Sequence, residues 1–301
     1  MKKFFSILAV ACIAMLFSSC HKEGVFNPKK KISKTYTYRT TTVDGTTTTT
    51  NKVLSEVWNW NNNTLKRIDH YDYDGKISGT TTYTYDKKRV VRVDESYQSM
   101  FSNYNSHIYF IYDGKYLSEA KIYEGDEWES TLKFTHQNGK ISQIVFTSNF
   151  REEKGKSLKT RALQYILPPQ ICQTIQQIEK KKQTVNAGEG SESTTMTLTW
   201  NKDNITKIAC VDEFFGERYE YSIEAEYDNY NNPFYGLFDL EMYDKGNLCK
   251  NNIVKQTWIY PDETPSSENF QYTYKGKYPV TCTSTDPHSD NNTFTTEYEY
   301  K

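Results

Sequence analysis

Apolar and polar residues alternate with a period of two over most of the chain after residue 33. Between residues 219 and 227 the odd positions are tyrosine, isoleucine or alanine, and the even positions are glutamate or serine. At the C-terminus, Phe294, Thr296, Tyr298 and Tyr300 alternate with polar residues in the same way. Because successive side chains of a strand face opposite sides of a sheet, this pattern predicts half-buried β-strands.

Turn signals separate the strand-like runs. Asp44-Gly45, Asp74-Gly75, Asp113-Gly114 and Asn138-Gly139 each lie between two such runs. Both central residues of a type I′ turn need positive φ, which Asn, Asp and Gly tolerate best. We therefore expect antiparallel hairpins, with the clearest at Asp44-Gly45 between two threonine-rich runs.

A degenerate repeat joins these hairpins. Each copy has two apolar, mostly aromatic, residues separated by one residue, a polar turn, and then two spaced apolar residues. Trp58 and Trp60 with Leu65 and Ile68 form one copy, and the chain contains at least three more of the same form. Successive hairpins in chain order form an up-and-down meander. At about 12 residues for each strand and turn, we expect an all-β protein of roughly 16–20 antiparallel strands. The repeat places Trp58, Trp60 and Trp200 in the core.

Residues 151–192 interrupt the alternation. After Pro168-Pro169, isoleucines at 171, 175 and 178 have the spacing of one helix face, and three lysines at 180–182 suit a helix C-terminus. We expect a short helix and a flexible loop inserted into a single β-rich domain of residues 34–301. The insertion could be a plug, a lid or a long crossover.

The N-terminus is typical of an export signal. Two lysines precede an apolar stretch from Phe4 to Phe17, which is shorter than a membrane-spanning helix. Ser18-Ser19-Cys20 then resembles a bacterial lipobox, with Phe17 where that motif usually has leucine. The resemblance implies a signal peptide of residues 1–19, lipid attached to Cys20, and a linker of residues 20–33. Plain secretion is the alternative.

Composition narrows the class of protein. Hydrophobic residues make up 36% of the chain, and tyrosine is the commonest aromatic, with 25 copies. Such a composition excludes a bundle of membrane helices, and the high aromatic content argues against disorder. The 37 basic and 38 acidic residues nearly balance, so the sequence lacks the basic excess that nucleic-acid binding requires.

Two families share features with this chain. Tyr71-Asp72-Tyr73-Asp74-Gly75 and Tyr83-Thr84-Tyr85-Asp86 resemble the tyrosine–aspartate (YD, Rhs-type) repeats of large bacterial shell proteins. The lipobox, the Tyr/Thr-rich hairpins and the segment from Tyr227 to Phe234 resemble lipoproteins of unknown function from Gram-negative gut and oral bacteria. That second resemblance implies a porin-like barrel, and it brings no catalytic residues.

The residues offer few sites of known chemistry. No metal-binding histidine pattern, GxSxG motif or P-loop is present, and His70 to Gly75 lacks two ligands of a calcium loop. We therefore expect no catalytic residues, no metal and no cofactor.

Trp128 lies outside the repeat register and is the candidate for stacking on a sugar. Cys172, Cys210, Cys249 and Cys282 could form two disulfides or remain thiols.

Three functional classes remain open. The first is a lipid-anchored outer-membrane lipoprotein, facing the periplasm or the cell surface, that binds or scaffolds a glycan, a peptide or an outer-membrane partner. The second is a transmembrane pore, since strands of such barrels also alternate. The third is a glycan-active hydrolase, because acidic residues are plentiful enough for a carboxylate pair. The first is the hypothesis that the sequence favours, with the membrane as a partner through the N-terminal lipid.

Overall fold

The protein is an all-β structure in the computed structural model, which describes residues 23–98, 103–150, 190–214, 217–237, 248–261, 263–286 and 289–301. Its strands are β1 (Ile32–Val43), β2 (Thr46–Thr49), β3 (Val53–Asn61), β4 (Thr64–Tyr71), β5 (Ile77–Asp86), β6 (Arg89–Gln98), β7 (Asn103–Asp113), β8 (Tyr116–Glu124), β9 (Glu127–Gln137), β10 (Lys140–Phe150), β11 (Gly190–Asn201), β12 (Asn204–Phe214), β13 (Glu217–Tyr227), β14 (Ile253–Ile259), β15 (Ser266–Lys275), β16 (Tyr278–Asp286) and β17 (Ser289–Tyr300).

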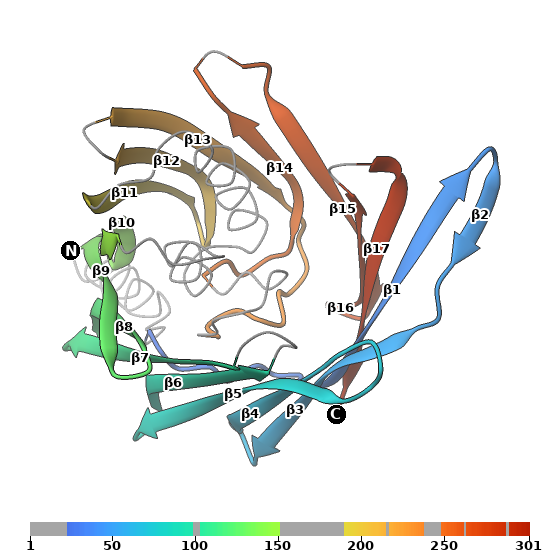
Figure 1. The fold of residues 1–301 in the computed structure, drawn as a ribbon, viewed down its shortest axis with the longest axis horizontal. Helices are drawn as coiled ribbons and strands as arrows, with labels where there is room; N and C mark the ends of the chain where they lie inside the picture. The colour runs from blue at the N-terminus through green and yellow to red at the C-terminus, as the bar shows by residue number, and fades with distance from the viewer. Residues whose placement is uncertain are drawn as a thin grey trace, which may run out of the picture.

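The strands close into a barrel (Figure 1). From β3 to β17 each strand pairs antiparallel with its neighbour in the chain, and β1 pairs with both β17 and β3. These sixteen strands form the ring. β2 is a seventeenth strand, which pairs with the second half of β1 as a projecting hairpin. The predicted meander and its strand number are confirmed.

The hairpins follow the turn residues that the sequence predicts. Asp44 and Gly45 have φ values of 49° and 75°, and Asn138 and Gly139 have 54° and 78°, as type I′ turns require. At Asp74-Gly75 the turn is longer. The Asp72 carboxylate accepts hydrogen bonds from the backbone N–H groups of Asp74 and Lys76.

The interior of the barrel is mainly apolar, with some buried polar and charged residues such as Glu95 and Asp212. Leu65, Ile68, Val93 and Ile144 are fully buried, and together with residues from most strands they form one large core cluster. Trp58 lies in this core, as predicted, while Trp60 and Trp200 pack against it half-buried. The outer wall carries cross-strand ion pairs, such as Lys207–Glu224 at 3.0 Å and Lys255–Glu226 at 3.4 Å.

One end of the barrel, here called the basal mouth, carries six two-residue turns and both described ends of the chain. These turns are 62–63, 87–88, 114–115, 138–139, 202–203 and 276–277. The last residue bonds back to the start of the chain, since the N–H of Lys301 donates to the carbonyl of Lys31.

Beside most of these turns, the hydroxyl of a tyrosine or the indole N–H of a tryptophan donates a hydrogen bond to a backbone carbonyl. The ring lies at the end of one strand, and the acceptor lies at the start of the strand before it in the chain or, for Trp60, at the start of β1. The pairs are Trp60–Ile32, Tyr85–Leu65, Tyr112–Val90, Trp200–Ile141, Tyr227–Ile205 and Tyr300–Pro279. We call these contacts ring latches. They account for the donor-bearing rings at the second aromatic position of three repeat copies, Trp60, Tyr85 and Trp200. The copy that ends in Phe134 has no such donor.

Several sequence predictions fall outside the described residues. The signal peptide, Cys20, Cys172 and the helix expected within 151–192 all lie there, so these remain predictions. β11 begins at Gly190, inside the range assigned to the insertion. Cys210, Cys249 and Cys282 are thiols, so the two-disulfide alternative is not seen among the described cysteines.

Candidate functional site

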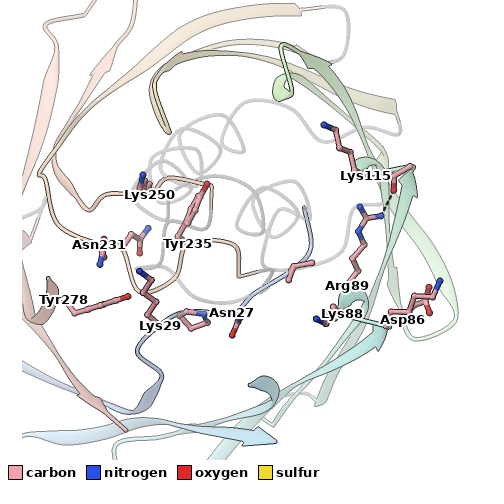
Figure 2. Close-up of a pocket in the computed structure, with 15 residues that line it drawn as sticks. Asn27, Lys29, Asp86, Lys88, Arg89, Lys115, Asn231, Tyr235, Lys250 and Tyr278 are labelled. Atoms are coloured by element: carbon pink, nitrogen blue, oxygen red, sulfur yellow. Dashed lines mark hydrogen bonds between the residues drawn. The ribbon is translucent and has the colours of Figure 1, made fainter. Parts of the chain in front are cut away.

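A cavity of about 1120 Å³ opens at the basal mouth (Figure 2). Two segments inside the barrel form one side of it. The N-terminal strap, residues 23–31, crosses the mouth, and the inner loop, residues 228–237 and 248–252, enters between β13 and β14. The turns between β5 and β6 and between β7 and β8 form the other side.

The cavity is strongly basic. Its described lining residues include one acidic side chain, Asp86, and six basic ones, which are Lys29, Lys87, Lys88, Arg89, Lys115 and Lys250. In Figure 2, Lys29 and Lys250 lie on the side of the inner loop, whereas Arg89 and Lys115 lie opposite them. Positive charge therefore surrounds the cavity, although the whole chain is nearly neutral. No local sequence pattern marks this site, because its basic residues come from four separate segments of the chain.

The strap is held in place by the half-buried carboxylate of Glu23. Glu23 accepts a hydrogen bond from the backbone N–H of Leu117 at 2.5 Å and lies 3.0 Å from His136 Nε2. The carbonyl of Gly24 accepts from the N–H of Val90, and the ring of Phe26 packs on Trp60 with centroids 5.6 Å apart. The strap therefore contacts wall strands from β3 to β9, which fixes one side of the cavity.

The inner loop is tied to the wall in a similar way. The backbone N–H of Asn231 donates to Lys277, and the ring of Tyr230 stacks on Tyr274 at 3.9 Å. Lys250 Nζ lies 3.2 Å from an Asp203 carboxylate oxygen. Burial alone would raise the pKa of Asp203, but Lys250 and Lys140 outweigh burial and hold that pKa below its usual value. Lys250 is thus fixed at the edge of the cavity.

Trp128 lies on the outer wall of the barrel. Its parity matches that of the buried Ser130 and Leu132, which would place it in the interior. However, Ile122 pairs with Ser130 and Tyr123 pairs with Trp128, so Glu129 is the extra residue of a β-bulge. Such a bulge re-aims side chains. It places Trp128 outside, 42% exposed, with its indole N–H donating to Thr131 Oγ1 at 3.1 Å.

Two tyrosines extend this surface. Tyr123 is the cross-strand partner of Trp128, and its ring meets Tyr109 edge-on with centroids 5.6 Å apart. The Arg92 guanidinium lies 5.0 Å from the centre of the Tyr109 ring and donates to its hydroxyl. We call Tyr109, Tyr123 and Trp128 the outer aromatic patch. The structure thus brings the predicted Trp128 together with two rings that the sequence analysis did not select.

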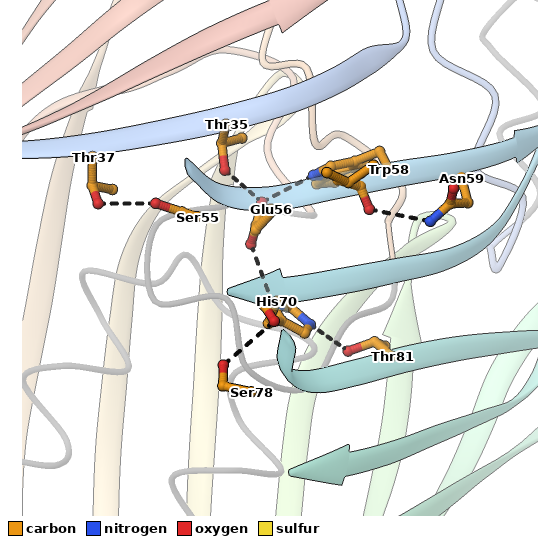
Figure 3. A network of polar contacts seen from close by, with 10 residues as sticks. Thr35, Thr37, Ser55, Glu56, Trp58, Asn59, His70, Ser78 and Thr81 are labelled. Carbon is orange, nitrogen blue, oxygen red and sulfur yellow. Dashed lines mark hydrogen bonds and ion pairs between the residues drawn. The ribbon is translucent and has the colours of Figure 1, made fainter. Parts of the chain in front are cut away.

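A third group of polar side chains forms a hydrogen-bonded network inside the barrel (Figure 3). Glu56 accepts hydrogen bonds from Thr35 and Trp58, and its other oxygen lies 3.7 Å from His70 Nδ1. His70 Nε2 lies 2.9 Å from Thr81 Oγ1. The order Thr–His–Glu is that of a catalytic triad, yet Thr81 is fully buried and 3.7 Å exceeds hydrogen-bond range. The network therefore joins β1, β3, β4 and β5 rather than offering a nucleophile to substrate.

The described residues contain no metal site. Among them, no group of three or more His, Cys, Asp or Glu side chains is placed to hold a metal ion. Nor do they contain a helix long and apolar enough to cross a membrane.

These features define a closed antiparallel β-barrel with a mainly apolar interior, an ionic outer wall and a basic cavity at one mouth. Its fold is similar to that of a porin-like protein from Bacteroides vulgatus, with 11% identity, a TM-score of 0.46, and 91% of this chain and 99% of that chain covered. A porin-like protein from Bacteroides uniformis is 9% identical, with a TM-score of 0.29 and coverage of 90% and 98%.

A third similar structure is that of TcdB2-TccC3, at 10% identity and a TM-score of 0.33. The alignment covers 85% of this chain and 13% of that chain. No model of a protein family matches the sequence, and no curated protein is similar to it.

Proposed function

We propose that this chain is an exported lipoprotein of the outer membrane or cell surface, whose barrel stands in water and serves a binding role without catalysis. The observation that carries the proposal is the polarity of the wall. The interior is mainly apolar, although the carboxylates of Glu56, Glu95, Asp212 and Glu268 are also buried there. The outer face carries ion pairs such as Lys207–Glu224 and Lys121–Glu119.

A pore would need a different outer wall. Transmembrane barrels have an apolar outer band about 25 Å tall and a polar interior. A basic side chain at the middle of the lipid face costs about 2–4 kcal/mol. Here Arg92, Lys121, Lys207 and Lys255 lie on the walls of four different strands. This arrangement favours water over lipid as the surroundings of the wall.

The test of this proposal is expression without detergent. The chain from His21 onward retains every described residue, and we expect it to be monodisperse in aqueous buffer by light scattering. It should also leave dye-loaded liposomes intact. Aggregation that only detergent reverses, together with release of the dye, would favour the pore instead.

The membrane link is proposed to be a lipid on Cys20. It rests on the lipobox-like Ser18-Ser19-Cys20 and on the apolar stretch before it. Labelling of cells with a palmitate analogue should mark the full-length chain, and Cys20→Ala should abolish the label. Cys249→Ala, which removes a buried thiol, is the control that should keep it. An unlabelled wild-type chain that is released from cells would point to plain secretion.

A glycan is the ligand that the outer aromatic patch supports best. Exposed indole and phenol rings offer flat apolar faces for sugar rings, and Arg92 and Asp94 beside them can bond hydroxyls. On a glycan array, Trp128→Ala should lose any signal of the wild type. Tyr219→Ala removes a ring of similar exposure, 41%, from β13 and should leave the signal unchanged. No wild-type signal, or equal loss in both variants, would refute glycan binding at the patch.

A further inference from the structure

We propose that the basal cavity binds a phosphate-bearing ligand, and that the headgroup of an anionic phospholipid is its source. The choice of headgroup rests on the proposed lipid anchor, whereas the binding of phosphate does not. The charge of the cavity, its size and its place on the barrel support this proposal.

The charges in the cavity are arranged for an anion. Lys29, Lys88 and Lys115 lie on the strap and on two different turns, and no carboxylate of the described chain pairs with them. Like charges that converge on one hollow repel one another, and a bound anion relieves that repulsion. The cavity therefore favours a ligand that carries more than one negative charge.

One cation in the cavity is held in a fixed orientation. Arg89 Nη1 donates to the carbonyl of Gly114 at 2.5 Å, and the guanidinium lies 4.7 Å from the centre of the Tyr112 ring. Tyr112 is itself fixed by its ring latch to Val90. A guanidinium held in this way needs little further ordering when it binds phosphate oxygens. Lys29, Lys88 and Lys115 around it add positive charge on long, flexible side chains.

The cavity has room for an organic phosphate. Its volume of about 1120 Å³ slightly exceeds the range of about 300–1,000 Å³ of ordinary ligand pockets. Asn27, Asn231 and Tyr278 add neutral hydrogen-bonding groups to the lining. These groups match the hydroxyls of a polar headgroup, while the basic residues match its phosphate.

The location of the cavity favours a membrane lipid as the source. Glu23, on the strap, lies at the basal mouth, and Cys20 precedes it by three residues. Three residues span at most about 11 Å, so a lipid on Cys20 would emerge close to this mouth. Basic side chains near an anionic bilayer are attracted to its surface. Lys30, Lys140 and Lys277 near the same end extend the positive surface beyond the cavity.

The experiment compares two variants of the chain from His21 onward. The cavity variant is Lys29→Gln with Lys88→Gln and Lys115→Gln. The wall variant, Lys121→Gln with Lys133→Gln and Lys207→Gln, removes the same charge from the outer face. Each protein is titrated with glycerol 3-phosphate by calorimetry, and is sedimented with vesicles of phosphatidylcholine alone or mixed with phosphatidylglycerol. Equal melting temperatures establish that the variants are folded.

We expect the wild type to bind glycerol 3-phosphate and to sediment with the phosphatidylglycerol vesicles but not with phosphatidylcholine alone. The cavity variant should bind both at least tenfold more weakly, and the wall variant should stay within twofold. Binding of glycerol 3-phosphate without vesicle binding keeps the phosphate site and overturns the headgroup as its source. No binding of either, or equal weakening in both variants, overturns the proposal. Failure of the Cys20 labelling test would leave these results unaffected, because the leaderless chain contains no Cys20.

Discussion

Tyr85 at the end of β5 donates its hydroxyl to the backbone carbonyl of Leu65 at the start of β4, at 2.7 Å. A register shift separates Thr84 from Tyr85 in the pairing with β6, and another lies beside Leu65 in the pairing with β3. The ring thus bonds the backbone at a point where the regular ladder is interrupted. The abundance of tyrosine in the chain follows in part from these ring latches.

Removal of one ring latch should destabilise the barrel. Tyr85→Phe keeps the ring but deletes the donor, which leaves the carbonyl of Leu65 without this bond. We expect a loss of about 1–2 kcal/mol in the free energy of unfolding, measured by urea denaturation. Tyr73→Phe is the matched control, because Tyr73 is 90% exposed and should change stability by less than about 0.5 kcal/mol. Equal effects of the two substitutions would contradict the role of the latch.

The barrel should lose stability in alkali. Burial raises the pKa of Tyr85, Tyr112 and Tyr300 well above the value of about 10 for an unfolded chain. A raised native pKa gives stability that is complete below pH 10 and is lost as pH rises toward the native values. Absorbance of tyrosinate at 295 nm and circular dichroism should change together above pH 10. Full ionisation near pH 10 with the fold intact would show that these hydroxyls are not buried.

Loss of Glu23 should free the strap from the wall. Glu23→Ala leaves the N–H of Leu117 and the ring of His136 without their carboxylate. We expect the destabilisation to be about 1–3 kcal/mol and faster hydrogen exchange in residues 23–31. Glu299→Ala, at the exposed end of β17, serves as the comparison and should leave exchange of the strap unchanged. Unaltered exchange in Glu23→Ala would mean that the Gly24–Val90 bond and the packing of Phe26 hold the strap without Glu23.

Gly79 should not tolerate a side chain. It pairs with His70 on one side and Tyr97 on the other, and an added Cβ would overlap the Tyr97 ring. That ring also packs on His70, with centroids 5.3 Å apart. We expect Gly79→Ala to cost about 1–3 kcal/mol, measured as a lower melting temperature. Gly276→Ser in an open turn has space for its side chain but a φ of 69°, so it tests backbone strain separately.

The sequence predicted the local structure of the barrel well. The hairpin at Asp44-Gly45 and the burial of Trp58 follow from a two-residue period and from turn chemistry, both of which act over a few residues. The strand number follows in turn, because each hairpin uses a similar length of chain.

The remaining features depend on contacts between distant residues. Trp128 has the parity of an interior residue, and the bulge at Glu129 that moves it outside has no marker in the sequence. Lys29, Lys88, Lys115 and Lys250 are spread over more than 200 residues, and only closure of the ring brings them to one cavity. The same holds for Glu56 and His70, whose pairing depends on the register of β3 and β4.

Closure between β1 and β17 also has a kinetic consequence. Tyr36 on β1 donates to Glu299 on β17, a partner 263 positions later in the chain. Contacts between such distant residues form slowly, because the intervening chain must first be ordered. The pairing of β1 with β17 therefore forms only after the last strand has been synthesised. Until then β1 and the growing end of the meander both present open backbone edges, at which an incomplete chain can pair with other chains and aggregate.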